Sequence, residues 1–278
     1  MQNHTIVILS RHEIEKFQHT ILNYYQKEGR SFAWRNEQDP YKIVVSEVML
    51  QQTQTFRVAP KYEAFILRFP DFASLAAAPL RDVLTAWQGL GYNRRGIALQ
   101  KIAQKVVDEF SGNLPQDPEI LVTFPGIGKA TAASICAFAF NKPTVFVETN
   151  IRAVFIHFFF QGLDDITDKQ ILALVQQTLH TTDPRQWYYA LMDYGVMLKK
   201  NIPNPSRKSA HHVQQSKFEG SHRQVRGMIL KSLLQIPSIG IAEFEALLQR
   251  DQRVIEKALD ELMHEGFVVI FNNHVMLR

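Results

Sequence analysis

Residues 121–141, LVTFPGIGKATAASICAFAFN, predict two helices joined by a glycine hairpin. A short apolar helix ends near Phe124, and a second helix begins at Lys129. Gly126 and Gly128 allow positive φ and close backbone approach, so the amides of the hairpin and of the second helix can converge on one anion. A phosphate is the anion we expect, although a simple packing pair of helices has the same pattern.

A carboxylate follows this hairpin at the start of another helix. Residues 144–150 read TVFVETN, which puts Glu148 directly before a helix predicted to begin near Ile151. If the hairpin holds DNA, this carboxylate would face it. The alternative is that Glu148 is only stabilised by the positive end of the helix, an effect of about 0.3–1 kcal/mol.

A second acidic residue, Glu47, lies in a helix predicted over residues 41–53, which is apolar nearly all round. A carboxyl group with such neighbours can have its pKa raised until it holds a proton near neutrality, as a general acid requires. It can equally point into a polar seam and bond to a helix end.

Residues 89–95, GLGYNRR, combine two glycines, a ring, an amide and two guanidinium groups. Such a loop is suited to entering a DNA groove and holding phosphates, although an ordinary surface loop is the alternative. Side-chain amides at the end of the preceding helix could fill a gap in a base stack, or could simply be exposed. The DNA contacts expected from these two segments are Gln51, Gln52, Tyr92, Asn93, Arg94 and Arg95.

The composition is that of a mainly α protein, with 46% hydrophobic residues in 278 and strand-like alternation confined to the C-terminal end. The net charge is +4 and the pI about 9.1, which fits local basic patches that meet nucleic acid. Cys136 is the single cysteine, which excludes an intrachain disulfide and any site built from several thiolates. The chain has no long apolar run and no leader pattern, so we expect no membrane contact and a cytoplasmic, nucleoid-associated or nuclear location.

Four motifs resemble, in order and spacing, the helix-hairpin-helix DNA glycosylases, and among them most closely the adenine glycosylases of the MutY type. The motifs are SEVMLQQT (46–53), GLGY (89–92), PGIG (125–128) and MDYG (192–195). The resemblance implies a two-lobed helical HhH-GPD fold in which Glu47 protonates the leaving purine. It also implies that Glu148 stands in place of the family's catalytic aspartate, with Asn150 beside it, and that Asp193 is a structural carboxylate that caps the hairpin region.

The chain departs from this family at several positions. Glu148 is one methylene longer than aspartate, and Ala130 stands where related strand-cutting enzymes carry a lysine. Asn93 replaces a second tyrosine of the MutY type. Residues 198–208, LKKNIPNPSRK, replace four cysteines, so the resemblance implies no iron–sulfur cluster, while Lys199 and Lys200 remain to bind phosphate together with Lys129 at the hairpin. A monovalent cation at the hairpin is the one ion still expected, and His211 and His212 are interpreted as surface residues.

The function predicted from these motifs is that of a monofunctional DNA glycosylase without strand-cutting activity. We expect a monomer that acts on double-stranded DNA with a mispaired or damaged base, with adenine opposite 8-oxoguanine or guanine as the leading substrate. Two alternatives stay open, a glycosylase for another base and a weak or inactive protein that binds DNA structure on the same fold.

The predicted organisation has four parts. Residues 1–30 form a helix that packs with the second lobe, residues 31–141 a six-helix barrel lobe with the hairpin, and residues 142–216 the second helical lobe. Residues 217–278 form a winged-helix-like module of three helices and a hairpin that turns at Asn272 and Asn273. Such modules usually bind duplex DNA, although they also serve as protein-docking surfaces, and the weakly charged third helix does not favour base reading.

Overall fold

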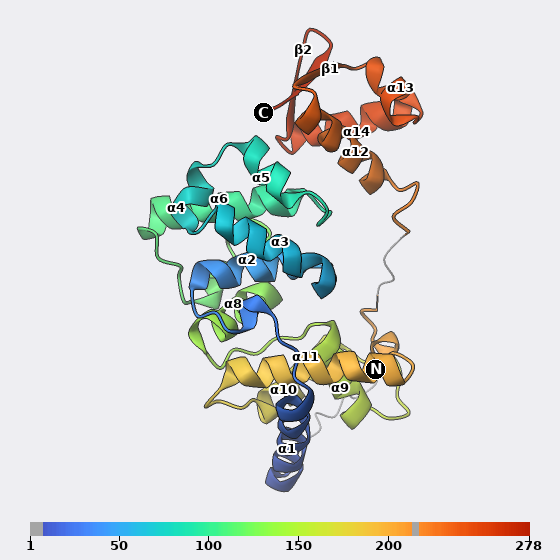
Figure 1. Ribbon diagram of the computed structural model, residues 1–278. Helices are drawn as coiled ribbons and strands as arrows, with labels where there is room; N and C mark the ends of the chain where they lie inside the picture. Colours follow the sequence, from blue (N-terminus) through green and yellow to red (C-terminus); the bar gives the residue numbers. More distant parts are fainter. Residues whose placement is uncertain (1–7, 213–216) are drawn as a thin grey trace. The chain divides into compact units, whose positions relative to one another are not determined.

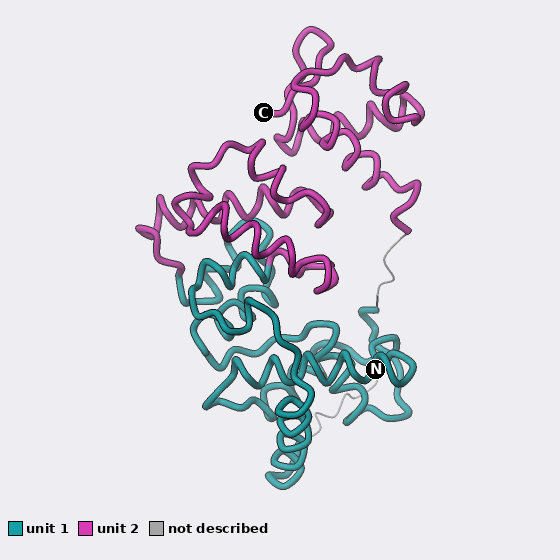
Figure 2. The backbone as a smooth tube through the Cα atoms, viewed as in Figure 1, with its two compact units in different colours: residues 1–47, 115–214 teal, residues 48–114, 215–278 magenta. Residues whose placement is uncertain are grey.

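A computed structural model of the chain describes residues 8–212 and 217–278 (Figure 1), and the description below concerns these residues. The protein is mainly α-helical, as predicted. It forms two compact units, each made of two separate stretches of chain (Figure 2). The first comprises residues 1–47 and 115–214, and the second residues 48–114 and 215–278. This division differs from the predicted one, because the hairpin falls in the first unit and the C-terminal module joins residues 48–114 in the second.

The first unit contains most of α2, the helices before it and the helices between residues 115 and 214. These elements are α1 (Arg11–Glu28), η1 (Ala33–Arg35), α2 (Pro40–Leu50), α7 (Pro118–Leu121), α8 (Lys129–Phe140), α9 (Thr149–Phe159), α10 (Asp168–Thr178), α11 (Pro184–Asn201) and η2 (Pro205–Lys208). The first helix begins after Ser10, because Ser10 and Glu13 form a capping box there.

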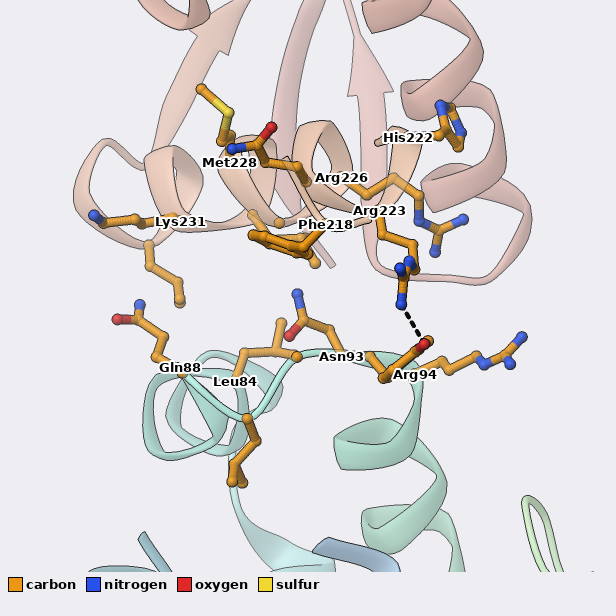
Figure 3. A pocket seen from close by; sticks show the side chains of 18 of the residues that line it. Leu84, Gln88, Asn93, Arg94, Phe218, His222, Arg223, Arg226, Met228 and Lys231 are labelled. Carbon is orange, nitrogen blue, oxygen red and sulfur yellow. Dashed lines mark hydrogen bonds between the residues drawn. The ribbon is translucent and has the colours of Figure 1, made fainter. Parts of the chain in front are cut away.

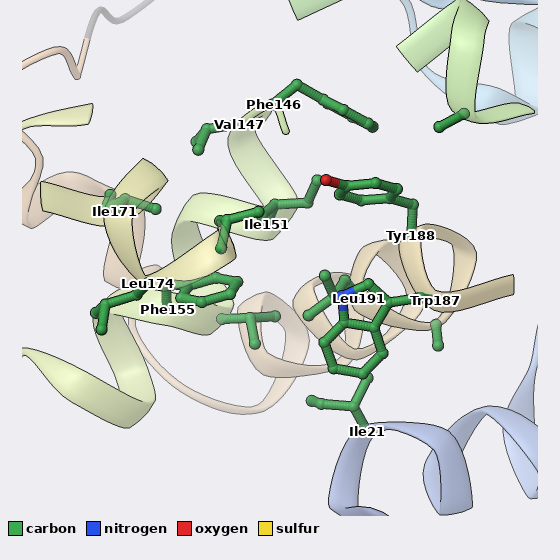
Figure 4. Close-up of a cluster of buried hydrophobic side chains, with 14 of the residues drawn as sticks. Ile21, Phe146, Val147, Ile151, Phe155, Ile171, Leu174, Trp187, Tyr188 and Leu191 are labelled. Atoms are coloured by element: carbon green, nitrogen blue, oxygen red, sulfur yellow. The ribbon is translucent and has the colours of Figure 1, made fainter. Parts of the chain in front are cut away.

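The core of the first unit lies where α11 packs against α9 and α1 (Figure 4). Phe17 on α1 meets Phe155 on α9 and Trp187 on α11 edge to face, with ring centroids 5.4 and 5.7 Å apart. All three side chains are buried. This aromatic packing holds the helix that follows Glu148 against α11.

The second unit contains four helices from the middle of the chain and the C-terminal module. They are α3 (Thr55–Arg68), α4 (Phe72–Ala77), α5 (Leu80–Trp87), α6 (Arg94–Phe110), α12 (His222–Gln235), β1 (Ser238–Gly240), α13 (Glu243–Leu248), α14 (Gln252–His264), β2 (Val268–Phe271) and β3 (His274–Leu277). The three strands form an antiparallel sheet in the order β1-β3-β2. The predicted hairpin is present, since Asn272 and Asn273 both adopt positive φ between β2 and β3. The short strand β1 was not predicted.

The C-terminal module shares a hydrophobic cluster with α5 and α6. Leu84 and Ile97 are buried in the same cluster as Ile229 and Phe244. Arg81 donates hydrogen bonds from its guanidinium to the carbonyls of residues 233 and 234, at the end of α12. The module is therefore packed onto α5 and α6 by apolar contacts and by a helix-end cap.

Candidate active site

Glu47 lies in the middle of α2, between residues that are almost fully buried. Its own side chain is half-buried, and its Oε2 atom accepts a hydrogen bond of 2.5 Å from Ser134 Oγ on α8. The pKa of Glu47 is raised to about 7, mainly by burial; the Ser134 bond opposes the rise, and the charge of Glu148 contributes to it. The predicted general acid thus has a pKa at which it can hold and release a proton near neutrality.

Ser134 was not anticipated from the sequence. It is buried at 4% exposure, and Oγ also lies 3.0 Å from the Thr131 carbonyl oxygen. A hydroxyl has one proton, so Ser134 can donate to ionised Glu47, or it can accept from protonated Glu47 while donating to Thr131. The bond to the ionised carboxylate is the stronger of the two, which is why Ser134 lowers the pKa of Glu47.

Glu148 is the N-cap residue of α9. Its Oε1 atom accepts hydrogen bonds from the backbone N–H groups of Asn150 (2.7 Å) and Ile151 (2.8 Å), and Oε2 accepts one from Asn150 Nδ2 (3.1 Å). Burial raises the pKa of Glu148, whereas these N–H groups and the charges of Lys199 and Arg152 oppose the rise. Glu148 is therefore stabilised by the positive end of α9, as the alternative interpretation predicts. It also fixes the carboxylate close enough to Glu47 for the two charges to interact.

Asn150 has one side-chain atom without a partner. Its Nδ2 group binds Glu148, but the buried Oδ1 atom accepts no hydrogen bond from the described residues. A buried acceptor in that state is costly, and it suits a donor such as a water or substrate group. Asn150 and Glu148 thus offer one free acceptor next to a carboxylate.

Two contacts fix the start of α9, and both come from motifs near residue 200. A Cβ atom on Gly195 of α11 would lie 2.4 Å from the Asn150 carbonyl oxygen, so this position requires glycine. The hydroxyl of buried Ser206 in η2 donates to the Thr149 carbonyl at 2.9 Å. The MDYG motif and the segment after α11 therefore position Glu148 and Asn150.

The two lysines predicted to bind phosphate differ in their surroundings. Lys199 is half-buried and interacts with the charge of Glu148; burial lowers its pKa, and Glu148 opposes that shift. Lys200 is exposed. Lys199 thus supports the ionised state of Glu148, a role that spacing alone did not indicate, and Lys200 is the more accessible of the two.

Asp193 is structural, as predicted, but with different partners. Its carboxylate, on a residue with 2% exposure, accepts hydrogen bonds from Arg30 N and Arg35 Nη1, both at 2.7 Å. Burial would raise the pKa of Asp193, but the bonds from Arg35 and Arg30 outweigh it and keep the pKa below its usual range. The predicted capping of the hairpin is thus replaced by a tie between α11 and residues 30–35.

The hairpin is formed where the sequence predicts it. Gly126 has φ +75°, and Gly128 is the N-cap of α8, whose first turn has no side-chain cap. Both glycines are exposed together with Lys129 and Ala130, while Ile127 is buried beneath them. An exposed helix start without a side-chain cap and with an adjacent lysine suits an anion.

One predicted DNA contact in the loop 89–95 is wrong. Arg95 is buried, and its Nη1 atom donates to the carbonyls of Val48 (2.9 Å), Met49 (3.0 Å) and Gln51 (2.6 Å) at the end of α2. The C-terminal end of a helix favours a cation, so this guanidinium is a helix cap and does not face DNA. Arg94 next to it is exposed.

Tyr92 and its neighbours line a pocket of the second unit. Tyr92 has φ +44°, and its ring lies under the guanidinium groups of Arg95 and Arg223, 5.5 and 5.1 Å from the ring centroid. Its hydroxyl accepts a hydrogen bond from Arg223. Gln52 and Asn93 line the same pocket, whereas Gln51 contributes its carbonyl to the Arg95 cap.

Comparison with known proteins agrees with this arrangement. Residues 45–179 match the HhH-GPD superfamily of base excision DNA repair proteins. The chain is 39% identical to the adenine DNA glycosylase of Mycobacterium tuberculosis over 276 residues, which covers 89% of the chain and 88% of that protein. It is 31% identical to the adenine DNA glycosylase of Mycolicibacterium smegmatis, with 89% and 91% covered. The chain belongs to the HhH-GPD superfamily.

One further relative is longer than this chain, and a similar solved structure is less similar in sequence. The chain is 36% identical to the adenine DNA glycosylase of Buchnera aphidicola subsp. Baizongia pistaciae, with 66% of the chain and 52% of that protein covered, so it matches about half the length of this relative. Among solved structures, a thermostable thymine-DNA glycosylase has a TM-score of 0.63 and 24% identity, with 70% of the chain and 91% of that structure covered. This likeness shows the HhH-GPD fold of the chain.

The described residues contain neither a cluster of metal ligands nor a helix that could span a membrane. Across residues 8–212 and 217–278, no three His, Cys, Asp or Glu side chains come together in a way that could hold a metal ion. In the same ranges, no helix has the length and apolarity to cross a membrane.

Proposed function

We propose that the protein is a monofunctional DNA glycosylase that hydrolyses the bond between a mispaired or damaged base and its sugar. The observation that carries the proposal is Glu47, whose pKa of about 7 and contact with Ser134 suit a general acid beside the Glu148 carboxylate. The superfamily of base excision DNA repair proteins supports it independently.

Cleavage of the glycosidic bond requires a proton donor near the base and an ionised carboxylate near the sugar. Cleavage of the glycosidic bond builds negative charge on the departing base and positive charge on the sugar. Protonated Glu47 would donate its proton to the base, while ionised Glu148 would stabilise the sugar cation. The N–H bonds to Glu148 and the neighbouring charge of Lys199 favour its ionised form. Asn150 Oδ1 would accept a hydrogen bond from the attacking water.

DNA would be held mainly by the hairpin and by exposed side chains nearby. The start of α8, which has no side-chain cap, would bind a phosphate together with Lys129, and Lys200 would add a second contact. Extrusion of the target base costs a few kcal/mol, which the phosphate contacts would offset. A monovalent cation at the hairpin would strengthen the phosphate contact.

We infer the substrate from the relatives. Several are named adenine DNA glycosylases, so adenine opposite 8-oxoguanine or guanine is the first candidate. Ala130 on the exposed turn of α8 has no amine for a Schiff base, which supports base release without strand cutting. The chain has one cysteine and so would work without an iron–sulfur cluster. We expect a monomer associated with DNA.

A panel of duplexes tests the proposal. Each duplex carries one mismatch or lesion, and alkali after incubation reveals abasic sites as strand breaks. We expect cleavage of the adenine mismatches by the wild type and its loss in Glu47→Gln and Glu148→Gln. The exposed Glu28→Gln serves as a control that keeps activity. Tight, salt-sensitive binding of every duplex with no abasic product would instead support a protein that only binds DNA structure.

A further inference from the structure

The second unit contains a pocket of about 980 Å³ whose lining includes neither Glu47 nor Glu148 (Figure 3). One wall is α12 with the residues just before it, and the other is the loop 88–94 with part of α3. Figure 3 shows Phe218, Arg223 and Lys231 on one side, opposite Gln88, Asn93 and Arg94. Its volume is near the upper end of the roughly 300–1,000 Å³ usual for ligand sites, which leaves room for more than a single small molecule.

The charge of this pocket indicates an anionic ligand. Six basic side chains and two carboxylates line it, an excess of four positive charges that equals the net charge of the whole chain. Arg226 pairs with both carboxylates, at 2.8 Å from Glu261 and 2.7 Å from Glu265. Among the described residues, these two carboxylates form no ion pair with the other basic side chains of the lining, Arg57, Lys61, Arg94 and Lys231.

The apolar part of the lining indicates a flat ligand group. Phe218 lines the pocket with 58% of its surface exposed, so its ring is accessible to a flat group. Leu84, Met228 and Leu234 add apolar surface nearby. Phosphates with flat, partly apolar groups between them are the features of a nucleic acid strand, and an aromatic ring in a basic groove is a usual means of binding one.

We propose that this pocket binds a short single-stranded segment of DNA, with a base stacked on Phe218 and phosphates on the basic residues around it. The strand must be unpaired there, because the faces of paired bases are covered by their neighbours in a duplex. The Arg223 contact to Tyr92 links the two walls, so the module and the loop 88–94 form the site together.

Fluorescence anisotropy with a labelled dT8 strand tests this proposal. We expect Lys231→Glu and Phe218→Ala each to weaken binding of dT8 by about tenfold. Lys257→Glu makes the same charge change on an exposed position of α14 outside the pocket and should leave the affinity unchanged. Because Lys231 is exposed, its variant should fold, and thermal unfolding checks both variants.

Two further probes separate the base from the phosphates and the strand from a duplex. An eight-unit abasic strand should lose affinity with Lys231→Glu but not with Phe218→Ala. Equal affinity of wild type and Phe218→Ala for dT8, or weakening by Phe218→Ala of duplex binding alone, would overturn the proposal. Glu47→Gln should bind dT8 like the wild type, so failure of the glycosylase assay leaves this test intact.

Discussion

Ser134 Oγ lies 2.5 Å from Glu47 Oε2, and it does so from the helix that begins at the exposed hairpin. The residue that adjusts the pKa of the candidate acid therefore belongs to the same helix whose first turn suits a DNA phosphate. A shift of α8 when the hairpin binds DNA would change the length of this hydrogen bond.

Replacement of Ser134 should change the pH dependence of base release. In Ser134→Ala the pKa of Glu47 should rise above about 7, because the bond that favours the ionised form is lost. Activity depends on protonated Glu47, so the alkaline limb of the single-turnover rate should move to higher pH. Ser134→Thr keeps the hydroxyl and should keep the wild-type profile. An unchanged limb in Ser134→Ala would argue against Glu47 as the acid.

The carboxyl group of Glu47 should also lower the free energy of unfolding at alkaline pH. Its folded-state pKa of about 7 lies above the unfolded value, so the folded form holds a proton that the unfolded chain releases between about pH 4.5 and 7. Stability falls across this window as pH rises. Glu47→Gln removes the effect, so it should be nearly neutral at pH 4.5 and stabilising by about 1–3 kcal/mol at pH 8. Urea unfolding at both pH values measures the difference in free energy of unfolding between the variant and the wild type. The same difference at pH 4.5 and at pH 8 would refute the prediction.

The sequence motifs predicted the hairpin and the places of Glu47 and Glu148 on their helices. These features depend on local structure, which the spacing of glycines and of apolar residues indicates directly. The partners of these residues were less predictable. Ser134 is 87 positions from Glu47, and no periodicity connects them. A polar residue inside the apolar helix 129–140 was the available signal, and it also fits a harmless back-bond to the preceding turn.

Adjacent arginines show a further limit of sequence patterns. Arg94 and Arg95 look alike in a basic loop, yet α6 begins there and turns one outward and the other inward. The inward direction depends on where the end of α2 lies, which is a tertiary fact. Similarly, nothing in the sequence of residues 217–235 indicates that Arg223 binds Tyr92.

Gly195 should be required for activity more than for folding of α11. A methyl group there would lie 2.4 Å from the Asn150 carbonyl, so Gly195→Ala must push α9 away. We expect a loss of about 1–3 kcal/mol in stability and a rate reduced by roughly 100-fold, as a displacement of about 1 Å at a catalytic group can cause. Gly227→Ala on α12 is the matched control, since its Cβ atom would meet no neighbour within 4 Å and the change should stabilise the helix by about 0.5–1 kcal/mol. Wild-type kinetics in Gly195→Ala would contradict the role given to this contact.

Ala130 should make the protein unable to form a covalent adduct with abasic DNA. The side chain on the exposed turn of α8 has no amine, and Lys129 leaves the helix about 100° away from it. Incubation with a substrate duplex and borohydride should give no trapped complex on a denaturing gel. Ala130→Lys should introduce a trapped species if this position faces the sugar. An adduct with the wild type would show that another amine does the chemistry.

Alanine substitution should lower stability at Arg95 and weaken DNA binding at Arg94. Arg95→Ala leaves the carbonyls at the end of α2 without their donors and should destabilise the protein by about 2–4 kcal/mol in urea unfolding. Arg94→Ala removes an exposed charge, so stability should stay within about 0.5 kcal/mol of wild type. If Arg94 contacts a phosphate, the slope of log affinity against log salt for a duplex should fall by about one in its variant. Arg95→Ala, measured below its unfolding transition, should keep the wild-type slope, and a reduced slope would mean that its guanidinium leaves α2 to meet DNA.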